Sequence, residues 1–401
     1  MYSQPDDAGD NKPTKTVNYF AHEWNSMGHS VVVLHCPSKF PLIYYLSPKS
    51  FLDIISRRVS TMIPPKSSRK DLYYSESGID IFRLPMLKFY PGMPFPKWRI
   101  QNQKIKICKL LRKRDFYPDI VVGHFANPSA EIVSLLAQYY KIKSSIVFHH
   151  DCTRENIQKY RIKEFINEIG AIGARSILEA KQIQADLNLD KLPFVCYSGV
   201  PNDAVEFAEK ECHKMDFHDG IRHIYVGSLI RRKHLDVTIK AFLSTKGPND
   251  TLSVVGGGPE ESKLRDLARS LDKTGSIYFF GRISRHEALE KMKKSQIFTL
   301  ISDGETFGMV YIEAMLQGCL VIASKGGGFD GIIRDGVNGF LCNPGDSEML
   351  ETIYRRIQGM SDIQRNRIGQ NAIDTALHYS EREVAERYLN DILANQKQEA
   401  T

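Results

Sequence analysis

Two glutamates, Glu305 and Glu313, stand at the ends of a nonapeptide whose residue types could bind a charged ligand rich in hydroxyl groups. Glu305 follows an apolar, strand-like segment (296–302), and Glu313 lies within an apolar helical run, Met309 to Leu316. Gly308 lets the backbone approach a ligand at the helix start, where free N–H groups favour an anion such as phosphate. The pattern fits a ligand that carries phosphate in its middle and hydroxyls at both ends, as a nucleotide sugar does.

Each glutamate alone has a plainer explanation, because a glutamate before a helix is often a cap and one inside a helix is usually solvated. The surrounding sequence favours the ligand. A further apolar segment (319–324) leads to three glycines, 326–328, and then to the run 335–341, of the form D-G-x-N-G-F-L. Upstream, basic residues follow an apolar segment at 226–233, and a glycine turn follows another at 254–259.

These motifs, between about residues 224 and 346, resemble the donor-binding half of the retaining glycosyltransferases of family 4, which belong to the glycosyl transferases group 1. The first half of the chain resembles the family more weakly. The resemblance implies the GT-B fold: two Rossmann-like domains with parallel sheets that face a cleft, and a C-terminal helix that crosses back to the first domain.

The resemblance also implies roles for individual residues. It assigns catalysis to Glu305, Lys233 and His149, and donor binding to Arg232, Thr306, Phe307, Gly308, Met309 and Glu313. Glu305 would bind hydroxyls of the donor sugar, Glu313 would bind the ribose, and the segment 306–308 would act largely through its backbone. Fixed cations stabilise a departing diphosphate. Ser228 stands where many relatives have arginine, so either Arg231 or Arg232 would supply the charge beside Lys233.

His149 ends a predicted strand and aligns with a family histidine that lies near the donor sugar. The register is ambiguous by one residue, so His150 is the alternative, and His124 at the end of another strand is a weaker candidate. A histidine at a strand end is also often purely structural. Front-face attack, in which the departing phosphate takes the acceptor proton, needs no protein nucleophile, so Glu305 is not assigned that role.

Neither a metal nor a separate cofactor is expected. No Asp-x-Asp pair stands at a strand end where it could hold a divalent ion, which favours metal-independent transfer. The turn 256–258 lacks the G-x-G-x-x-G spacing of a dinucleotide fingerprint, and this disfavours an NAD enzyme. The nucleotide sugar would be a substrate.

Alternating strand and helix patterns predict an α/β protein with parallel sheets. Predicted strands are 29–35, 79–84, 120–124, 145–149 and 194–197 in the first half, and 223–226, 252–255, 276–280, 297–301 and 320–323 in the second. Helices are expected from an apolar stripe at 17–27 and over 129–140 and 381–394. The predicted domains are 1–205 on the acceptor side, 218–378 on the donor side, and 379–401 as the returning helix.

The start of the chain departs from the family, whose members open with a β-strand leading to a glycine-rich loop. Residues 1–13 have no strand pattern and are expected to be irregular. We therefore expect the N-terminal sheet to lack its usual first strand, as in a chain that starts too late. A sheet without that strand would leave backbone edges that the fold normally pairs.

Length and composition agree with a two-domain globular protein: 401 residues, 42% apolar and 25% charged. No apolar run approaches the length of a membrane helix, and the N-terminus has no signal-peptide pattern. The net charge is +7. Residues 57–114 hold 15 Lys and Arg against 3 Asp and Glu, which indicates an anionic membrane surface or acceptor, or else a solvated helix face. No nucleic-acid module is recognisable.

The expected function is transfer of a sugar from a nucleotide sugar to a saccharide or lipid-linked saccharide during synthesis of a surface polysaccharide such as capsule, exopolysaccharide or lipopolysaccharide. The protein would be cytoplasmic and peripheral on the inner face of the cell membrane. A nucleotide-sugar epimerase and a catalytically impaired GT-B binding or scaffold protein are the alternatives.

Overall fold

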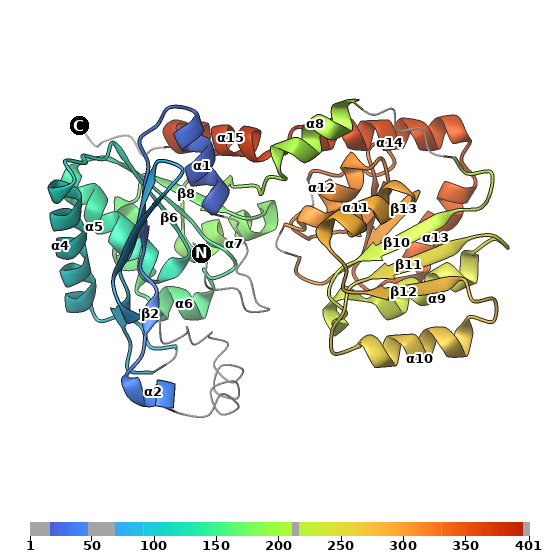
Figure 1. The fold of residues 1–401 in the computed structure, drawn as a ribbon, viewed down its shortest axis with the longest axis horizontal. Helices are drawn as coiled ribbons and strands as arrows, with labels where there is room; N and C mark the ends of the chain where they lie inside the picture. The colour runs from blue at the N-terminus through green and yellow to red at the C-terminus, as the bar shows by residue number, and fades with distance from the viewer. Residues whose placement is uncertain are drawn as a thin grey trace. The chain divides into compact units, whose positions relative to one another are not determined.

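The structure is a computed structural model that describes residues 17–46, 69–90, 92–210, 216–305, 307–329 and 331–395. The chain forms two compact units (Figure 1). Unit 1 comprises residues 1–175, 179–196 and 385–401, and unit 2 comprises 176–178 and 197–384. The last helix, α15 (Glu381–Ala394), enters unit 1 from Ala385 onward, which confirms the predicted return of the C-terminal helix to the first domain.

Unit 2 is built on one continuous parallel sheet of six strands in the order β12-β11-β10-β13-β14-β15. The strands are β10 (Arg222–Val226), β11 (Thr251–Val255), β12 (Ile277–Gly281), β13 (Ile297–Leu300), β14 (Leu320–Ser324) and β15 (Phe340–Cys342). Every residue of β13 and β14 is buried. Helices cover both faces of such a sheet, so its inner strands appear in the sequence as continuous apolar runs.

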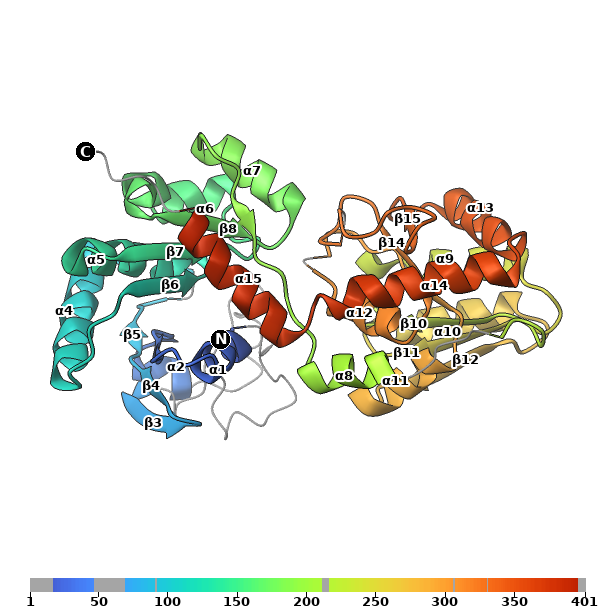
Figure 2. The same cartoon turned by 90° about the horizontal axis from the view of Figure 1, so that it is seen from above.

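Two groups of helices pack around this sheet (Figures 1 and 2). Helix α9 contacts α10 and α13, whereas α12 contacts α11 and α14. The helices are α8 (Asn202–Lys210), α9 (Leu235–Thr245), α10 (Glu261–Leu271), α11 (Arg285–Lys293), α12 (Met309–Leu316), α13 (Ser347–Gln358) and α14 (Asp362–Leu377). Reciprocal capping boxes, Ser284 with Glu287 and Ser361 with Gln364, fix where α11 and α14 begin.

Unit 1 divides its strands among three sheets. One is parallel, with β6 (Ile120–His124), β7 (Lys143–Val147), β8 (Ala171–Ala174) and β9 (Phe194–Val195). A second has the order β1-β4-β3, with β1 (Val32–His35), β4 (Ile79–Arg83) and β3 (Leu72–Glu76), and the third pairs β2 (Ser38–Lys39) with β5 (Met86–Leu87). β3 pairs antiparallel with β4, so this part of unit 1 is not purely parallel.

The second and third sheets of unit 1 form one continuous ladder. Backbone hydrogen bonds join β1 and β2 to β4 and β5: the N–H groups of Leu84, Met86 and Lys88 donate to the carbonyl oxygens of His35, Pro37 and Lys39, each over 2.8 Å. In the described ranges, no strand connects β1 with β6. The residues predicted to be irregular, 1–13, lie outside the described residues, so the expectation of a missing first strand stays a prediction.

The helices of unit 1 are α1 (Asn18–Ser26), α2 (Leu42–Leu46), α4 (Lys97–Lys113), η2 (Ala126–Ala130), α5 (Glu131–Tyr140), α6 (Arg154–Lys159), η3 (Ile162–Glu164), η4 (Ile166–Glu168) and α7 (Ile177–Leu187). The returning helix α15 is held by an aromatic cluster. Tyr388 packs edge-on against Phe20 at 5.0 Å, and Trp24 Nε1 donates to the carbonyl oxygen of Ala385 over 2.9 Å. No helix in the described ranges is both long and apolar enough to cross a membrane.

Candidate active site

Three of the predicted donor-side residues meet at the carboxyl ends of β10 and β13 in unit 2, where ligands bind in open parallel sheets. Glu305 follows β13, and Arg232 and Lys233 lie in the short helix η5 (Arg231–Lys233) after β10. Lys233 Nζ is 3.4 Å and Arg232 Nη1 is 3.8 Å from Glu305 Oε2. Ser302 Oγ donates to the same carboxylate oxygen over 3.0 Å.

Hydrogen bonds between the two loops fix this cluster. The N–H of Asp303 donates to the carbonyl oxygen of Arg232 over 2.7 Å, and Arg232 Nη1 donates to the carbonyl oxygen of Asp303 over 3.0 Å. The N–H of Gly328 donates to the carbonyl oxygen of Glu305 over 2.8 Å. The Lys233 side chain is only 12% exposed, so its ammonium is held in place before any ligand binds.

The glycine turn 256–258 has a packing role that its sequence pattern did not indicate. A Cβ atom at Gly256 or Gly258 would overlap the carbonyl oxygen of Gly227 or of Leu229. The two loops are also joined by a hydrogen bond from the Leu229 N–H to the carbonyl oxygen of Gly257 over 3.1 Å. Glycine is needed here because the loop after β11 lies directly against the loop after β10.

The start of helix α12 offers backbone donors to a ligand. Gly308 is the N-cap with φ +75°, and no side chain caps the helix. The N–H groups of Met309 and its neighbours therefore point out of the helix end, as at anion sites. Phe307 is 3% exposed and its ring packs 5.6 Å from that of Phe329, so only its backbone can reach a ligand. Thr306, also predicted to bind the donor, lies outside the described residues.

Glu313 is held by a residue that the sequence analysis did not single out. Arg285 Nε donates to Glu313 Oε1 over 2.8 Å, and the Glu313 side chain is 15% exposed. Arg285 is the first residue of α11, as the capping pattern Ser284-x-x-Glu287 could have indicated. Its pairing with a residue 28 positions away depends on how α11 and α12 pack together.

In unit 1 the structure joins two of the predicted histidines. His124 Nδ1 lies 2.9 Å from His149 Nε2, and the His149 ring stacks on Phe125 with 4.1 Å between centroids. Burial lowers the pKa of both imidazoles well below the usual value, so the pair is neutral at neutral pH. Tyr388 OH lies 3.4 Å from His124 Nε2.

The structure also separates His149 from His150. β7 ends at Val147, so His149 lies two residues beyond the strand and not at its last position as predicted. The His150 side chain is 44% exposed and lies 3.8 Å from Glu179. The His149 N–H donates to Asp151 Oδ1 over 2.9 Å, which turns the loop so that His149 faces His124.

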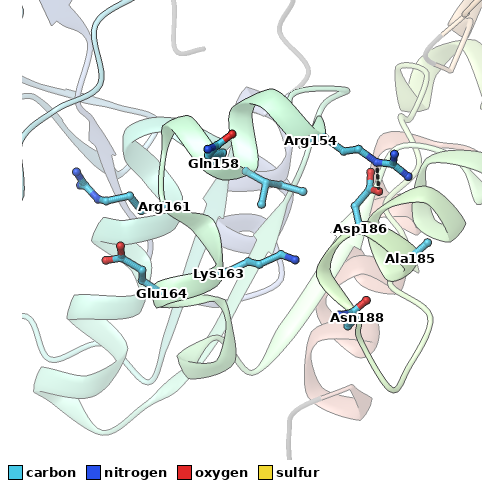
Figure 3. A pocket seen from close by; sticks show the side chains of 9 residues that line it. Arg154, Gln158, Arg161, Lys163, Glu164, Ala185, Asp186 and Asn188 are labelled. Carbon is cyan, nitrogen blue, oxygen red and sulfur yellow. Dashed lines mark hydrogen bonds and ion pairs between the residues drawn. The ribbon is translucent and has the colours of Figure 1, made fainter.

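A separate hollow of about 580 Å³ opens on unit 1 (Figure 3). It is lined by residues of α6, η3 and α7, including Arg154, Lys163 and Asp186, and Arg154 is paired with Asp186 at 2.7 Å. No predicted site residue lines it. In the described part of the chain, no group of three His, Cys, Asp or Glu side chains is arranged to hold a metal ion. Metal-independent transfer remains a prediction.

Comparisons with known proteins define the class. Residues 214–375 match the family described as glycosyl transferases group 1. The chain is 26% identical over 267 residues to an uncharacterized glycosyltransferase of Methanocaldococcus jannaschii, covering 65% of this chain and 71% of that one. It is 22% identical over 252 residues to alpha-monoglucosyldiacylglycerol synthase of Streptococcus pneumoniae, covering 60% and 57%.

A solved structure supports the fold over nearly the whole chain. The crystal structure of Anabaena HepE in complex with UDP-glucose superposes with a TM-score of 0.57 at 17% identity, over 91% of this chain and 100% of that one. The solved structure thus shows a GT-B fold, the family match and the relatives indicate a glycosyltransferase, and unit 2 contains the region that matches the family.

Proposed function

We propose that this protein is a retaining, metal-independent glycosyltransferase that moves a sugar from a nucleotide sugar to a saccharide or lipid-linked acceptor in surface polysaccharide synthesis. The observation that carries the proposal is the convergence of Lys233, Arg232 and Glu305 beside the uncapped start of α12. Cations and helix N–H groups suit a diphosphate, and a carboxylate among them suits sugar hydroxyls. The UDP-glucose complex of a protein with the same fold supports a nucleotide-sugar donor.

In this proposal unit 2 acts mainly on the leaving group. The bond between the sugar's anomeric carbon and the diphosphate oxygen breaks, and negative charge develops on that oxygen. Lys233, Arg232 and the N–H groups of Met309 and the following residue stabilise this charge. The acceptor hydroxyl oxygen forms the new bond on the same face of the sugar, and its proton passes to the departing diphosphate. Glu305 holds the sugar hydroxyls and Glu313 the ribose.

The histidine pair of unit 1 is assigned to hydroxyl binding. We take the Tyr388 hydroxyl as the donor to His124 Nε2, which lies 3.4 Å away. The His124 proton then lies on Nδ1 and is donated to His149 Nε2. His149 consequently carries its own proton on Nδ1, so it presents a neutral N–H donor to a hydroxyl oxygen and does not serve as a base there.

We also propose that unit 1 binds the cytoplasmic face of a membrane, where a lipid-linked acceptor would lie. β2 and β5 are parallel, so the segments that follow them leave the sheet at the same edge. These segments expose apolar side chains: Ile43 (69%), Leu46 (76%), Phe89 (55%) and Tyr90 (56%). Arg99 lies 5.5 Å from the Phe89 ring and 4.6 Å from that of Trp98. Apolar tips beside basic residues suit an anionic bilayer surface. Residues 57–68 of the predicted basic segment lie outside the described residues.

Release of nucleoside diphosphate from a panel of nucleotide sugars, with and without extracts containing lipid-linked saccharides, tests the transferase proposal. Acceptor-dependent release, with the anomeric configuration kept in the product by NMR, is the expected result. Unchanged activity after complete removal of divalent ions is expected as well. Binding without release under any acceptor condition would favour the scaffold alternative, and inversion of configuration would contradict the retaining mechanism.

Vesicle sedimentation tests the membrane proposal separately. Ile43→Asp with Phe89→Asp should release the protein from anionic vesicles, while Tyr278→Asp, at an exposed aromatic position on unit 2, should not. Binding should also weaken as salt rises, because exposed charges are screened beyond about 8–10 Å. Equal sedimentation with neutral and anionic vesicles would count against it.

A further inference from the structure

Lys88 is a buried cation in unit 1 that the proposed transfer chemistry does not use. It follows β5 directly, and its N–H is fixed by the carbonyl oxygen of Lys39 at the end of the continuous ladder. The residue is 7% exposed, and its Nζ lies 4.5 Å from the centre of the Phe95 ring. In the described part of the chain, its ammonium has no carboxylate or hydrogen-bond partner.

A second ammonium approaches the same loop from helix α6. Lys159 Nζ lies 3.9 Å from where a Cβ of Gly92 would be, which places it against the backbone of the segment between Lys88 and Phe95. Within the described ranges, Lys159 also has no carboxylate partner. Its Nζ lies 5.6 Å from the centre of the Tyr160 ring. Burial, and then the charge of Lys159, lower the pKa of Lys88 to about 8.

Two carboxylates near this loop are already engaged with other cations. Glu131 Oε2 lies 3.1 Å from Arg161, which also donates to the carbonyl oxygen of Phe95 over 3.3 Å. Glu164 is paired with Lys97 at 2.6 Å. The loop therefore holds two ammoniums that no described carboxylate pairs, an arrangement that is costly when one of the side chains is largely buried.

We infer that Lys88 and Lys159 bind a phosphoryl group at the loop between β5 and α4. A phosphoryl group carries the negative charge and the several acceptor oxygens that two ammoniums need. Lys88 is positioned by the sheet and Lys159 by a helix, so the two cations reach the same loop from separate elements. A single carboxylate could satisfy only one of them well.

The phosphoryl group could belong to a phosphorylated acceptor or to a lipid headgroup, since the exposed rings of Phe89 and Tyr90 follow Lys88 directly. Only the assignment to an acceptor rests on the proposed function. Phosphoryl binding at the lysine pair does not require sugar transfer, so the two can fail independently.

Amine labelling of the full chain, read at each lysine by mass spectrometry, tests the site. The donor site is first filled with excess nucleoside diphosphate, and the probes are inorganic pyrophosphate, phosphatidylcholine vesicles, and the same vesicles containing phosphatidic acid. Labelling of Lys88 should be slowed by pyrophosphate, whereas that of Lys97, paired with Glu164, should not. Lys159→Met should weaken the protection of Lys88 roughly 10- to 100-fold, and Lys159→Arg should retain it.

The outcomes separate the two sources. Protection by pyrophosphate points to a phosphorylated acceptor, and protection by phosphatidic acid vesicles alone points to a headgroup. If neither probe protects Lys88, or if Lys159→Met leaves the protection unchanged, the inference is wrong. Lys88→Met serves as a check on folding: without anion its thermal midpoint should equal or exceed that of the wild type, because a buried charge is replaced by an apolar chain of similar length. A lower midpoint would show that the ammonium has a structural role.

Discussion

The two units differ in how their strands are arranged and in which side chains form their polar centres. Unit 2 has one unbroken six-stranded parallel sheet whose inner strands β13 and β14 are fully buried. Unit 1 distributes its strands among three sheets, two of which are linked by backbone hydrogen bonds, and β1 is only half-buried along its whole length. The polar centres differ as well. In unit 2 they are ion pairs, one between loops at strand ends and one between helices α11 and α12, whereas in unit 1 the centre is a pair of neutral imidazoles.

We infer from this contrast that unit 2 stabilises developing charge and that unit 1 binds uncharged hydroxyl groups. An unbroken sheet holds neighbouring strand ends at fixed spacing, so Lys233 and Glu305 can be kept as a close charged pair without a ligand. Such preorganised charge suits a reaction in which negative charge develops on a leaving group. The neutral pair His124 and His149 suits uncharged hydroxyl groups, which need directed donors and acceptors but no counter-charge.

The largest expected effect on the rate of sugar transfer comes from removing the charge of Lys233 in unit 2. Lys233→Met should slow sugar transfer by roughly 10²- to 10³-fold, because one preorganised donor to the leaving group is lost. Single-turnover kinetics with saturating donor measures it. Lys240→Met is the matched control, because Lys240 is exposed on α9. A variant of Lys233 that keeps the wild-type rate while the donor affinity falls would show that this charge only binds the ground state.

The next effect concerns the backbone at the start of α12. Gly308→Ala combines a positive φ of +75° with a Cβ that would overlap the Tyr311 ring. Gly304→Ala has a similar φ of +59° but open space around the new Cβ. We expect roughly 1–2 kcal/mol of destabilisation from the left-handed backbone in both variants. Overpacking should add roughly 1–3 kcal/mol at Gly308 alone.

Chemical denaturation and nucleoside diphosphate titration of both variants separate the cost of the left-handed backbone from the cost of overpacking against the Tyr311 ring. Gly308→Ala should also weaken nucleotide binding, because displacing Tyr311 shifts the helix N–H groups that face the ligand. Equal losses of stability in the two variants would mean that the ring moves aside freely, and unit 2 would then be less rigid at its site than proposed.

Sequence patterns predicted unit 2 better than unit 1, for a physical reason. Strands β10 to β14 were each predicted within one residue of their bounds. The inner strands among them appear as continuous apolar runs because both faces of the sheet are covered. Strand β8 was missed, since Ala171–Ala174 contains small residues with little strand preference. Strand β3 was missed because its exposed, edge-strand sequence, Leu72–Glu76, carries no apolar run.

The site was predictable only where chemistry lies in local motifs. Glu305, Gly308 and Glu313 belong to one nonapeptide, so their common position followed from the chain. The pairing of Arg285 with Glu313, and that of His124 with His149, joins residues 28 and 25 positions apart. Such pairs depend on how neighbouring elements pack, which residue type and spacing alone do not specify.

Acidification should destabilise the protein through the histidine pair of unit 1. His124 and His149 stay neutral when folded because burial lowers the pKa of each, whereas in the unfolded chain they take up protons below about pH 6.5. The unfolded state therefore binds more protons, and stability falls as pH drops below that value. Each histidine contributes a slope of up to about 1.4 kcal/mol per pH unit.

The His124→Asn variant measures this contribution. Its unfolding free energy should depend less steeply on pH between about 6.5 and 5 than that of the wild type, since one proton-binding group of the unfolded state is gone. Other titrating groups are common to both proteins and largely cancel in the difference. Parallel pH profiles would mean that the folded pair accepts a proton, and the assignment of a neutral centre to unit 1 would fail.

The smallest effect tests whether the second ion pair of unit 2 is also preorganised for the donor. Arg285 is 46% exposed, so its pairing with Glu313 should contribute only about 0.2–1 kcal/mol to stability. Its larger consequence is to orient the carboxylate that is proposed to hold the ribose.

Glu313→Gln should weaken nucleoside diphosphate binding by about 1–3 kcal/mol through the hydrogen bonds to the ribose. Arg285→Gln should weaken it less, by up to about 1 kcal/mol, because the carboxylate remains but is no longer held. In a double-mutant cycle measured by calorimetry, the loss in the double variant should be close to that of Glu313→Gln alone, since Arg285 acts through Glu313. Additive losses would show instead that Arg285 contacts the nucleotide directly. Tighter binding by Arg285→Gln would show that the arginine competes with the ribose for the carboxylate, and preorganisation in unit 2 would then be limited to the pair formed by Lys233 and Glu305.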